Sequence, residues 1–389
     1  MKPTIPQGTR DFDAATVRKR NYIFNTIRSV FELYGYQPLE TPAMENLDTL
    51  MGKYGEEGDK LIFKILNNGL DNPAKAEKIK EGFTKITDGK SSKDITERAL
   101  RYDLTIPFAR YVAMNYNQLV MPFKRYQMQP VWRADRPQRG RYREFYQCDA
   151  DVVGSTSLLN ELELANIYAT VFQKMNIPVE IRMNNRKVLA ALAAQCGGAE
   201  NLTDITIAID KIDKIGMEKV MEELQQRGLN DAQVNTIKSF LNISGSNEEK
   251  LAQLKPLFAG NEIGLKGIEE LKYLNEGLKK SSTTNHQSQI DVTLARGLNY
   301  YTGTIFEVKA IGVQIGSIGG GGRYDDLTGL FGVPNVPGVG ISFGVDRIYD
   351  VLTELDIFPT EVAGGVQLLF FNLGEAEAAK AFELAQQLR

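Results

Sequence analysis

The spacing of apolar positions changes several times along the chain and predicts an order of helices and strands. Apolar residues recur every three or four positions in residues 14–34 and 158–175, which predicts two amphipathic helices. Strand-like patterns occupy the segments 36–42, 98–104, 123–133, 141–153, 177–184 and 289–310. Because helices and strands do not alternate regularly, we expect the α+β type of α/β fold, an antiparallel or mixed sheet flanked by helices.

Changes of composition predict a division into domains. Residues 186–285 consist of charged helical stretches such as MEKVMEELQQRGL, which indicates a helical domain inserted between two parts of a main domain, 1–185 and 286–365. Residues 366–389 predict one strand and one helix, which alone cannot bury a core, so we expect the truncated start of a further domain. The lysine-rich segment 71–94 predicts an exposed excursion.

Composition limits the kinds of protein and chemistry that are possible. No run approaches the roughly 20 apolar residues that span a bilayer, so we expect a cytoplasmic protein without a membrane segment. Cys148 and Cys196 are too few for a disulfide framework, and His286 is the one histidine in the sequence. One histidine is too few for a His-rich metal site and leaves little scope for histidine-based catalysis. The net charge of -3 argues against a protein that binds nucleic acid non-specifically along its length.

The most basic segment is RADRPQRGRYR, with arginines at 133, 136, 139, 141 and 143. The strand that follows it alternates between two kinds of face. One face, in steps of two from Arg143 to Asp151, reads Arg, Phe, Gln, Asp, Asp, whereas the other is largely apolar. Phe145 and Asp151 would lie roughly 20 Å apart, comparable with the length of an aminoacyl-adenylate.

Arginine pairs two phosphate oxygens with its planar fork and stacks on a base with its flat face. The sequence contains neither a G-x-x-x-x-G-K-[ST] loop nor a G-x-G-x-x-G that opens a helix. If ATP binds, we expect it to bind through arginines on a sheet. The alternative for the arginine-rich segment is a solvated hairpin tip.

A second concentration of unusual residues is LARGLNYYTG, with Arg296, Tyr300 and Tyr301, followed by four glycines at 319–322. Glycines remove side chains where backbone must approach something closely. A plain strand with packed tyrosines and a flexible hairpin turn are the alternatives. Arg347, on a predicted helix after glycine-rich backbone, is a third candidate.

With these residues, the chain resembles the class II aminoacyl-tRNA synthetases, specifically the histidyl family, over most of residues 1–365. Residues 17–44, 123–154 and 337–348 look like the three class motifs. LARGLNYYTG and GGGGRYDDL, together with LRYDLT, are similar to the signatures that set the histidyl family apart. The resemblance implies an antiparallel catalytic sheet, a helical insertion domain and normally a C-terminal anticodon-binding domain.

The resemblance also implies substrates, partners and residue roles. ATP is a substrate with Mg²⁺, histidine and histidine tRNA are the partners, and a homodimer forms through residues 17–44. Arg133 would hold the α-phosphate, Phe145 would stack on adenine, and Arg347 would cover the other ring face and the γ-phosphate. Arg296 would act as the catalytic cation.

For histidine, the resemblance implies two groups of residues. Asp103, Thr105 and Gln147 would receive the α-amino group, while Asp151 and Tyr301 would bind the imidazole with Tyr300 beside them. Arg136 and Gln138 match positions that in the family meet the acceptor end of the tRNA. The sequence departs from the family at Asp135, where glutamate is common, and at Asn299, where aspartate is common.

The function that these observations predict is a histidine–tRNA ligase. A synthetase-like histidine-sensing regulatory subunit of ATP phosphoribosyltransferase is the main alternative, because such a subunit also lacks the anticodon domain. A tRNA-binding or stress-sensing module without catalysis is a third reading. The set of motif arginines argues for the ligase.

Overall fold

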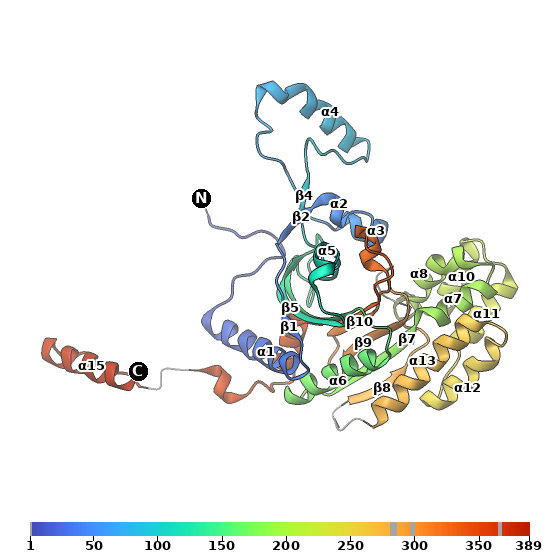
Figure 1. Ribbon diagram of the computed structural model, residues 1–389. Coiled ribbons are helices and arrows are strands. Elements are labelled where there is room, and N and C mark those ends of the chain that lie inside the picture. Colours follow the sequence, from blue (N-terminus) through green and yellow to red (C-terminus); the bar gives the residue numbers. More distant parts are fainter. Residues whose placement is uncertain (1, 281–285, 296–299, 365–367) are drawn as a thin grey trace.

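The centre of the computed structural model, which describes residues 2–280, 286–295, 300–364 and 368–389, is an eight-stranded sheet (Figure 1). Its order is β1-β5-β6-β11-β10-β9-β7-β8. The strands are β1 (Gln37–Pro38), β5 (Phe123–Trp132), β6 (Glu144–Val153), β7 (Val179–Asn185), β8 (His286–Ile290), β9 (Thr304–Ala310), β10 (Gly319–Arg323) and β11 (Gly338–Gly344). The inner pairs are antiparallel, and only β1 on β5 and β8 on β7, at the two edges, are parallel. The predicted sheet flanked by helices is confirmed.

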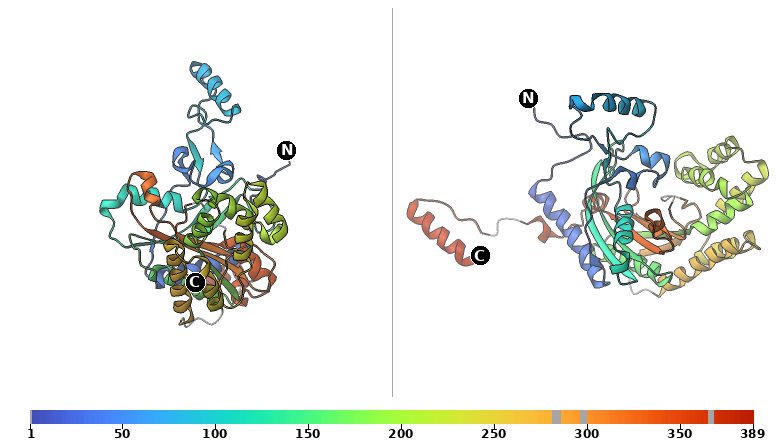
Figure 2. Two further views of the ribbon diagram at one scale, coloured as in Figure 1. Left: turned by 90° about the vertical axis from the view of Figure 1, so that its right-hand side faces the viewer. Right: turned by 45° about the horizontal axis from the view of Figure 1, so that its top comes forward.

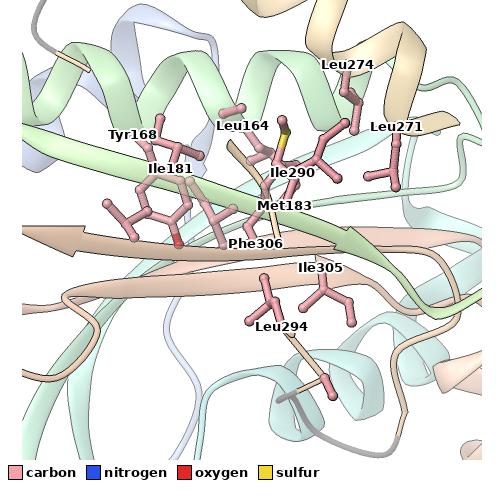
Figure 3. Packing of buried hydrophobic residues seen from close by; sticks show 14 of the residues in the cluster. Leu164, Tyr168, Ile181, Met183, Leu271, Leu274, Ile290, Leu294, Ile305 and Phe306 are labelled. Atoms are coloured by element: carbon pink, nitrogen blue, oxygen red, sulfur yellow. The ribbon is translucent and has the colours of Figure 1, made fainter. Parts of the chain in front are cut away.

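The helices α1 (Ala14–Leu33), α6 (Leu159–Lys174) and α14 (Val345–Glu354) pack against one face of this sheet. The alternation predicted for β6 explains the packing, because Cys148, Ala150 and Val152 are fully buried in the hydrophobic core. Figure 3 shows the same layer further along the sheet, where Leu164 and Tyr168 of α6 lie near Ile181 of β7. The opposite face of β6 is left for polar side chains.

The helical segment after β7 lies at one end of the sheet (Figure 1). It comprises α7 (Arg186–Gln195), η3 (Ala199–Asn201), α8 (Leu202–Ile209), α9 (Ile212–Ile215), α10 (Met217–Gln226), α11 (Asp231–Leu241), α12 (Asn247–Leu257) and α13 (Glu262–Lys279). Its buried side chains, such as Phe240 and Phe258, belong to the same hydrophobic cluster as the sheet. The segment therefore shares a core with the sheet, and its standing as a separate domain remains a prediction.

A smaller sheet with the order β2-β4-β3 lies beside α5 and has its own hydrophobic cluster. Its surroundings are β2 (Met44–Asn46), α2 (Leu47–Leu50), α3 (Gly55–Lys60), β3 (Lys64–Ile65), β4 (Arg98–Leu100), α5 (Thr105–Asn115), η2 (Tyr116–Gln118) and η4 (Leu327–Phe331). Arg101, which follows β4, is 1% exposed and donates to the backbone oxygens of Thr41 and Pro130. These hydrogen bonds tie the small sheet to the main one.

The polar segment 71–94 extends away from the rest of the molecule in the views of Figures 1 and 2. It forms η1 (Pro73–Lys75) and α4 (Ala76–Thr87), and nearly all of its side chains are exposed or half-exposed. The exposed excursion is thus confirmed, while the helix within it was not predicted. Gly82 packs closely on Ser92 and Ile95, where an added Cβ would lie 2.8 Å from both side chains.

The C-terminal segment differs from the prediction. After η5 (Thr360–Ala363), residues 368–374 form no strand in the described part of the chain, and α15 (Glu375–Leu388) follows. The apolar pattern of LLFF suggested a strand, but a strand needs neighbouring backbone to pair with. Leu368, Leu369 and Phe371 are more than half exposed.

Candidate active site

Two adjoining cavities lie on the polar face of β6. The larger has a volume of about 600 Å³ and the smaller about 50 Å³. Their shared lining consists of Arg133, Gln147, Tyr301, Gly320, Gly321 and Ser342. Because these residues contribute to both walls, a ligand in one cavity would lie next to a ligand in the other.

Most of the residues predicted to meet ATP or histidine line one cavity each. Phe145 and Arg347, predicted to meet ATP, line only the larger cavity. The residues predicted to meet histidine that line only the smaller cavity are Asp103, Thr105, Asp151 and Tyr300, whereas Arg133, Gln147 and Tyr301 line both. Segments far apart in the sequence, from α5, β6 and the chain before β9, supply these side chains.

Arg133 lies at the junction of the two cavities, directly after β5. Its Nε donates to the Tyr102 carbonyl (3.0 Å), and one Nη lies 3.4 Å from Gln147 Oε1. The guanidinium carbon is 4.3 Å from the ring centre of Tyr102 and 5.1 Å from that of Phe145. A cation over two aromatic rings is held in a defined plane, so its position is prepared before a ligand arrives.

Arg347 is held at the other wall of the larger cavity. It projects from the first turn of α14, and its guanidinium donates to the backbone oxygens of Gly140 (2.8 Å) and Ser317 (2.7 Å). The preceding residue, Asp346, forms ion pairs with Arg10 and Arg20, and the Arg20 pair is 2.5 Å long. The bond to Gly140 attaches α14 to the arginine-rich loop, and the Asp346 pairs attach α14 to α1 and to the segment before it.

Asp151 is an acidic residue of the smaller cavity and is 2% exposed. Its Oδ2 lies 2.9 Å from a guanidinium nitrogen of Arg125, and its Oδ1 accepts from the Tyr324 hydroxyl. Burial raises the pKa of Asp151, while Arg125 and the Tyr324 hydrogen bond lower it. Arg125 and Tyr324 therefore fix the position of the carboxylate, which can accept a hydrogen bond from a ligand in the cavity.

Asp103, just before α5, also lines the smaller cavity. Its Oδ1 accepts from the Tyr54 hydroxyl (3.0 Å) and the Ile106 N–H (3.1 Å), and its Oδ2 lies 3.4 Å from the Tyr300 hydroxyl. Burial raises the pKa of Asp103, and the Ile106 N–H and the nearby Arg133 lower it. An acidic group held in this way suits an ammonium ligand.

The glycines of β10 and β11 allow the strands to pass close to the acidic residues. A Cβ on Gly340 would lie 1.9 Å from Asp151 Oδ1, and one on Gly321 would lie 2.2 Å from the Gly340 carbonyl oxygen. Gly320 is different, because its Cβ would meet only the Phe306 carbonyl oxygen, at 3.5 Å. A small side chain at position 320 would therefore fit, and it would occupy space in both cavities, because Gly320 lines both.

We therefore expect Gly320→Ala to fold normally but to raise the KM of the substrates. The added methyl group would occupy cavity space, and one methyl group in a binding site changes recognition by about tenfold or more. Gly321→Ala is the contrasting variant, since its Cβ would strike backbone and lower the melting temperature. Steady-state kinetics and thermal unfolding of both variants test this, and unchanged KM values in a folded Gly320→Ala would contradict it.

Several predicted residues are not in either cavity. Arg136 and Gln138 lie in the loop between β5 and β6, where Gln138 forms a β-bridge with Arg141, and neither lines a cavity wall. Arg296 and Asn299 lie outside the described residues. Asp135 lines the larger cavity, and its carboxylate is 3.5 Å from a guanidinium nitrogen of Arg141.

Other residues of the site were not assigned from the sequence. Arg125, Tyr54 and Tyr324 contact the predicted acidic residues, and Asp149 lines the smaller cavity between Gln147 and Asp151. Strand alternation already placed Asp149 on the polar face. Arg125 could have been suspected only from the register that places it opposite Asp151.

The described residues offer limited support for a metal ion. They contain no group of three or more His, Cys, Asp or Glu side chains arranged to hold one. Glu307 and Asp135 nevertheless line the larger cavity. Magnesium usually keeps several waters and is bound by one or two carboxylates together with substrate phosphates, so this wall fits Mg²⁺ that arrives with a nucleotide.

Comparison with known proteins agrees with this geometry. The family model for histidyl-tRNA synthetase matches residues 71–348. The chain is 55% identical to a histidine–tRNA ligase of Bacteroides fragilis (strain YCH46) and 53% identical to that of Porphyromonas gingivalis (strain W83), in each case over the whole chain and 85% of the relative. None of the described helices is long and apolar enough to cross a membrane.

Solved structures show the same fold. The crystal structure of histidyl-tRNA synthetase from Nostoc sp. PCC 7120 matches with a TM-score of 0.81 and 33% identity, over all of this chain and 84% of that one. A Bacillus halodurans structure, described as an ATP phosphoribosyltransferase regulatory subunit/histidyl-tRNA synthetase, matches with a TM-score of 0.74 over all of this chain and 90% of that one. At 19% identity, the second likeness shows the fold alone.

The antiparallel sheet, its two cavities and these likenesses define an aminoacyl-tRNA synthetase of class II. Within that class, the chain belongs to the histidyl-tRNA synthetase family. The high identities to histidine–tRNA ligases favour the ligase over the regulatory subunit.

Proposed function

We propose that this chain activates histidine with ATP and transfers it to the 3′ end of histidine tRNA. The observation that supports the proposal best is the pair of cavities that meet at Arg133. Phe145 and Arg347, expected to bind the nucleotide, line the larger cavity, and most of the residues expected to bind the amino acid line the smaller one. The junction is therefore where the two substrates would react.

In the first step, a carboxylate oxygen of histidine attacks the α-phosphorus of ATP, and the bond to pyrophosphate breaks. Arg133 holds the α-phosphate at the junction and balances the charge that spreads over its oxygens. Phe145 stacks on adenine, and Arg347 covers the other ring face and reaches the γ-phosphate. Mg²⁺, when bound, neutralises charge on the phosphates.

Histidine is held by two sets of contacts. Asp103, Thr105 and Gln147 receive the α-amino group, so that the carboxylate is directed toward Arg133. Asp151 and Tyr301 bind the imidazole, with Tyr300 beside them. Because the cavity contains buried polar groups, an amino acid without a matching ring would leave those groups without partners.

The second step transfers the histidyl group to the tRNA. A hydroxyl of the terminal ribose attacks the histidyl carbonyl carbon, and AMP leaves. Arg136 and Gln138, in the exposed loop beside the larger cavity, are proposed to meet the acceptor end. Arg296 is proposed to act as a further catalytic cation in adenylate formation.

We further propose that the chain works as a homodimer in the cytoplasm, through residues 17–44. Part of this segment is exposed on the surface, since Leu33 is 70% and Val17 is 41% exposed. The proposed dimer would cover these side chains. Sedimentation equilibrium tests the assembly state directly.

The activity is tested by histidine-dependent exchange of labelled pyrophosphate into ATP. We expect robust exchange in the wild type and a loss of about 10²-fold or more in Arg296→Ala, because removal of one charge-stabilising donor costs that much in related chemistry. Histidine binding without exchange by the wild type would contradict the proposed ligase and support a histidine-sensing protein.

A further inference from the structure

Asp149 is a buried acidic residue of the smaller cavity that the proposed mechanism does not use. It is 3% exposed and projects from the same face of β6 as Gln147 and Asp151. The strand register places Gln127 of β5 on one side of it and Ser342 of β11 on the other. A carboxyl group in this position borders the space assigned to the imidazole.

The charges around Asp149 disfavour its ionised form. Asp151 faces it from β6 and Asp103 from the start of α5, while Arg125 of β5 is already paired with Asp151. The other groups of the cavity wall that could carry a charge are Arg133 and the tyrosines 300, 301 and 324. The described residues thus bring three carboxyl groups to two guanidinium groups.

One hydrogen-bond donor is missing around Asp149. Its Oδ1 accepts no hydrogen bond from the described residues, and the same is true of Gln127 Oε1 on the neighbouring strand. The orientation of the Gln127 amide is defined by its Nε2, which donates to Thr41 Oγ1 (2.8 Å) and Gln129 Oε1 (2.5 Å). Gln129 Oε1 itself accepts from Arg101, so it cannot serve as a donor. Two acceptors without a hydrogen bond therefore belong to residues that are paired directly across β5 and β6.

We propose that Asp149 carries a proton in the functional enzyme, donates it to Gln127 Oε1, and thereby makes the cavity select a neutral imidazole. Asp149 is then a specificity-determining residue of the histidine cavity, and this inference rests on the proposed function. With Asp149 neutral, Asp151 is the single carboxylate that faces the ring, and Arg125 balances its charge. Ionised Asp149 would add an uncompensated negative charge next to the ligand.

The pKa of Asp149 agrees with this assignment. The pKa of Asp149 is raised to about 7: burial raises it most, Asp151 and Asp103 also raise it, and Arg125 and a hydrogen bond with Ser342 lower it. The protonated fraction therefore falls as the pH rises through about 7. Above that pH, histidine can bind only if the site first takes up a proton, and the KM for histidine should rise about tenfold per pH unit.

The test compares wild type with Asp149→Asn in histidine-dependent pyrophosphate exchange between pH 6 and 9. The asparagine amide can donate to Gln127 Oε1 without titrating. We expect the KM for histidine to rise in alkali for the wild type and to lose this rise in Asp149→Asn. Asp88→Asn, at an exposed site directly after α4, is the matched control and should keep the wild-type profile.

Two kinetic outcomes would overturn the proposal. If Asp149→Asn keeps the alkaline rise, then another group titrates. If Asp149→Asn raises the KM for histidine more than about 30-fold at every pH, an ionised carboxylate is required, as expected for recognition of a charged imidazolium.

Unfolding provides a readout that does not depend on histidine. A carboxyl group whose pKa is raised by folding destabilises the folded state progressively as the pH rises from its unfolded pKa toward about 7. Asp149→Asn should therefore gain stability relative to wild type between pH 5 and pH 8 in urea titrations. A constant difference over that range would contradict a protonated Asp149 even if the proposed ligase activity failed.

Discussion

Asp151→Asn is expected to raise the KM for histidine by about two orders of magnitude or more while the KM for ATP changes little. Asparagine keeps the shape but removes the charge that the cavity offers to the ring N–H. A site built around hydrogen bonds to its substrate loses this much when one partner is wrong. Pyrophosphate exchange measured at varied histidine and at varied ATP separates the two effects.

The same substitution also removes the partner of a buried cation. Arg125 is 0% exposed and pairs with Asp151 at 2.9 Å, and breaking a buried ion pair costs about 3–5 kcal/mol. Glu161→Gln is the matched control, because Glu161 is 0% exposed, pairs with Arg323 and lies outside both cavities. Both variants should lose stability, and only Asp151→Asn should lose histidine recognition. An unchanged KM for histidine in folded Asp151→Asn would remove Asp151 from the imidazole site.

Arg133→Ala is expected to lower kcat for pyrophosphate exchange by about 10²–10³-fold. Arg133 is the one cation among the described residues that lines both cavities, so it adjoins the place where the two substrates would react. Arg133→Lys should recover little, because lysine has neither the planar fork nor the flat face that stacks on Tyr102 and Phe145.

Arg139→Ala is the control for the charge of the arginine-rich loop. Arg139 is exposed and pairs with Glu354 at the surface, where ion pairs contribute little. Adenylate formation should therefore survive in this variant. Equal losses in Arg133→Ala and Arg139→Ala would show that the loop acts through its net charge and not through a positioned guanidinium.

Much of the fold could be predicted from the sequence because it depends on local periodicity. The 3.6-residue repeat of α1 and the two-residue repeat of β6 need only neighbouring residues to be recognised. The alternation along β6 also separated Phe145, Gln147 and Asp151 from the core side chains. Where local pattern was misleading, as in residues 368–374, the strand required a partner that local sequence does not reveal.

The sequence by itself determined the family, through motifs in which residue type and spacing are specific. It also determined which side chains of β6 face away from the core. Only the tertiary structure decided that Arg125 pairs with Asp151, that Tyr54 holds Asp103, and that Gly340 must lack a side chain next to a carboxylate. It likewise paired Gln127 with Asp149 across two strands, where an oxygen of each side chain has no hydrogen-bond donor among the described residues. The physical reason is that strand register and close backbone contacts arise between segments that are distant in the sequence. The burial that results decides which side chains can remain charged.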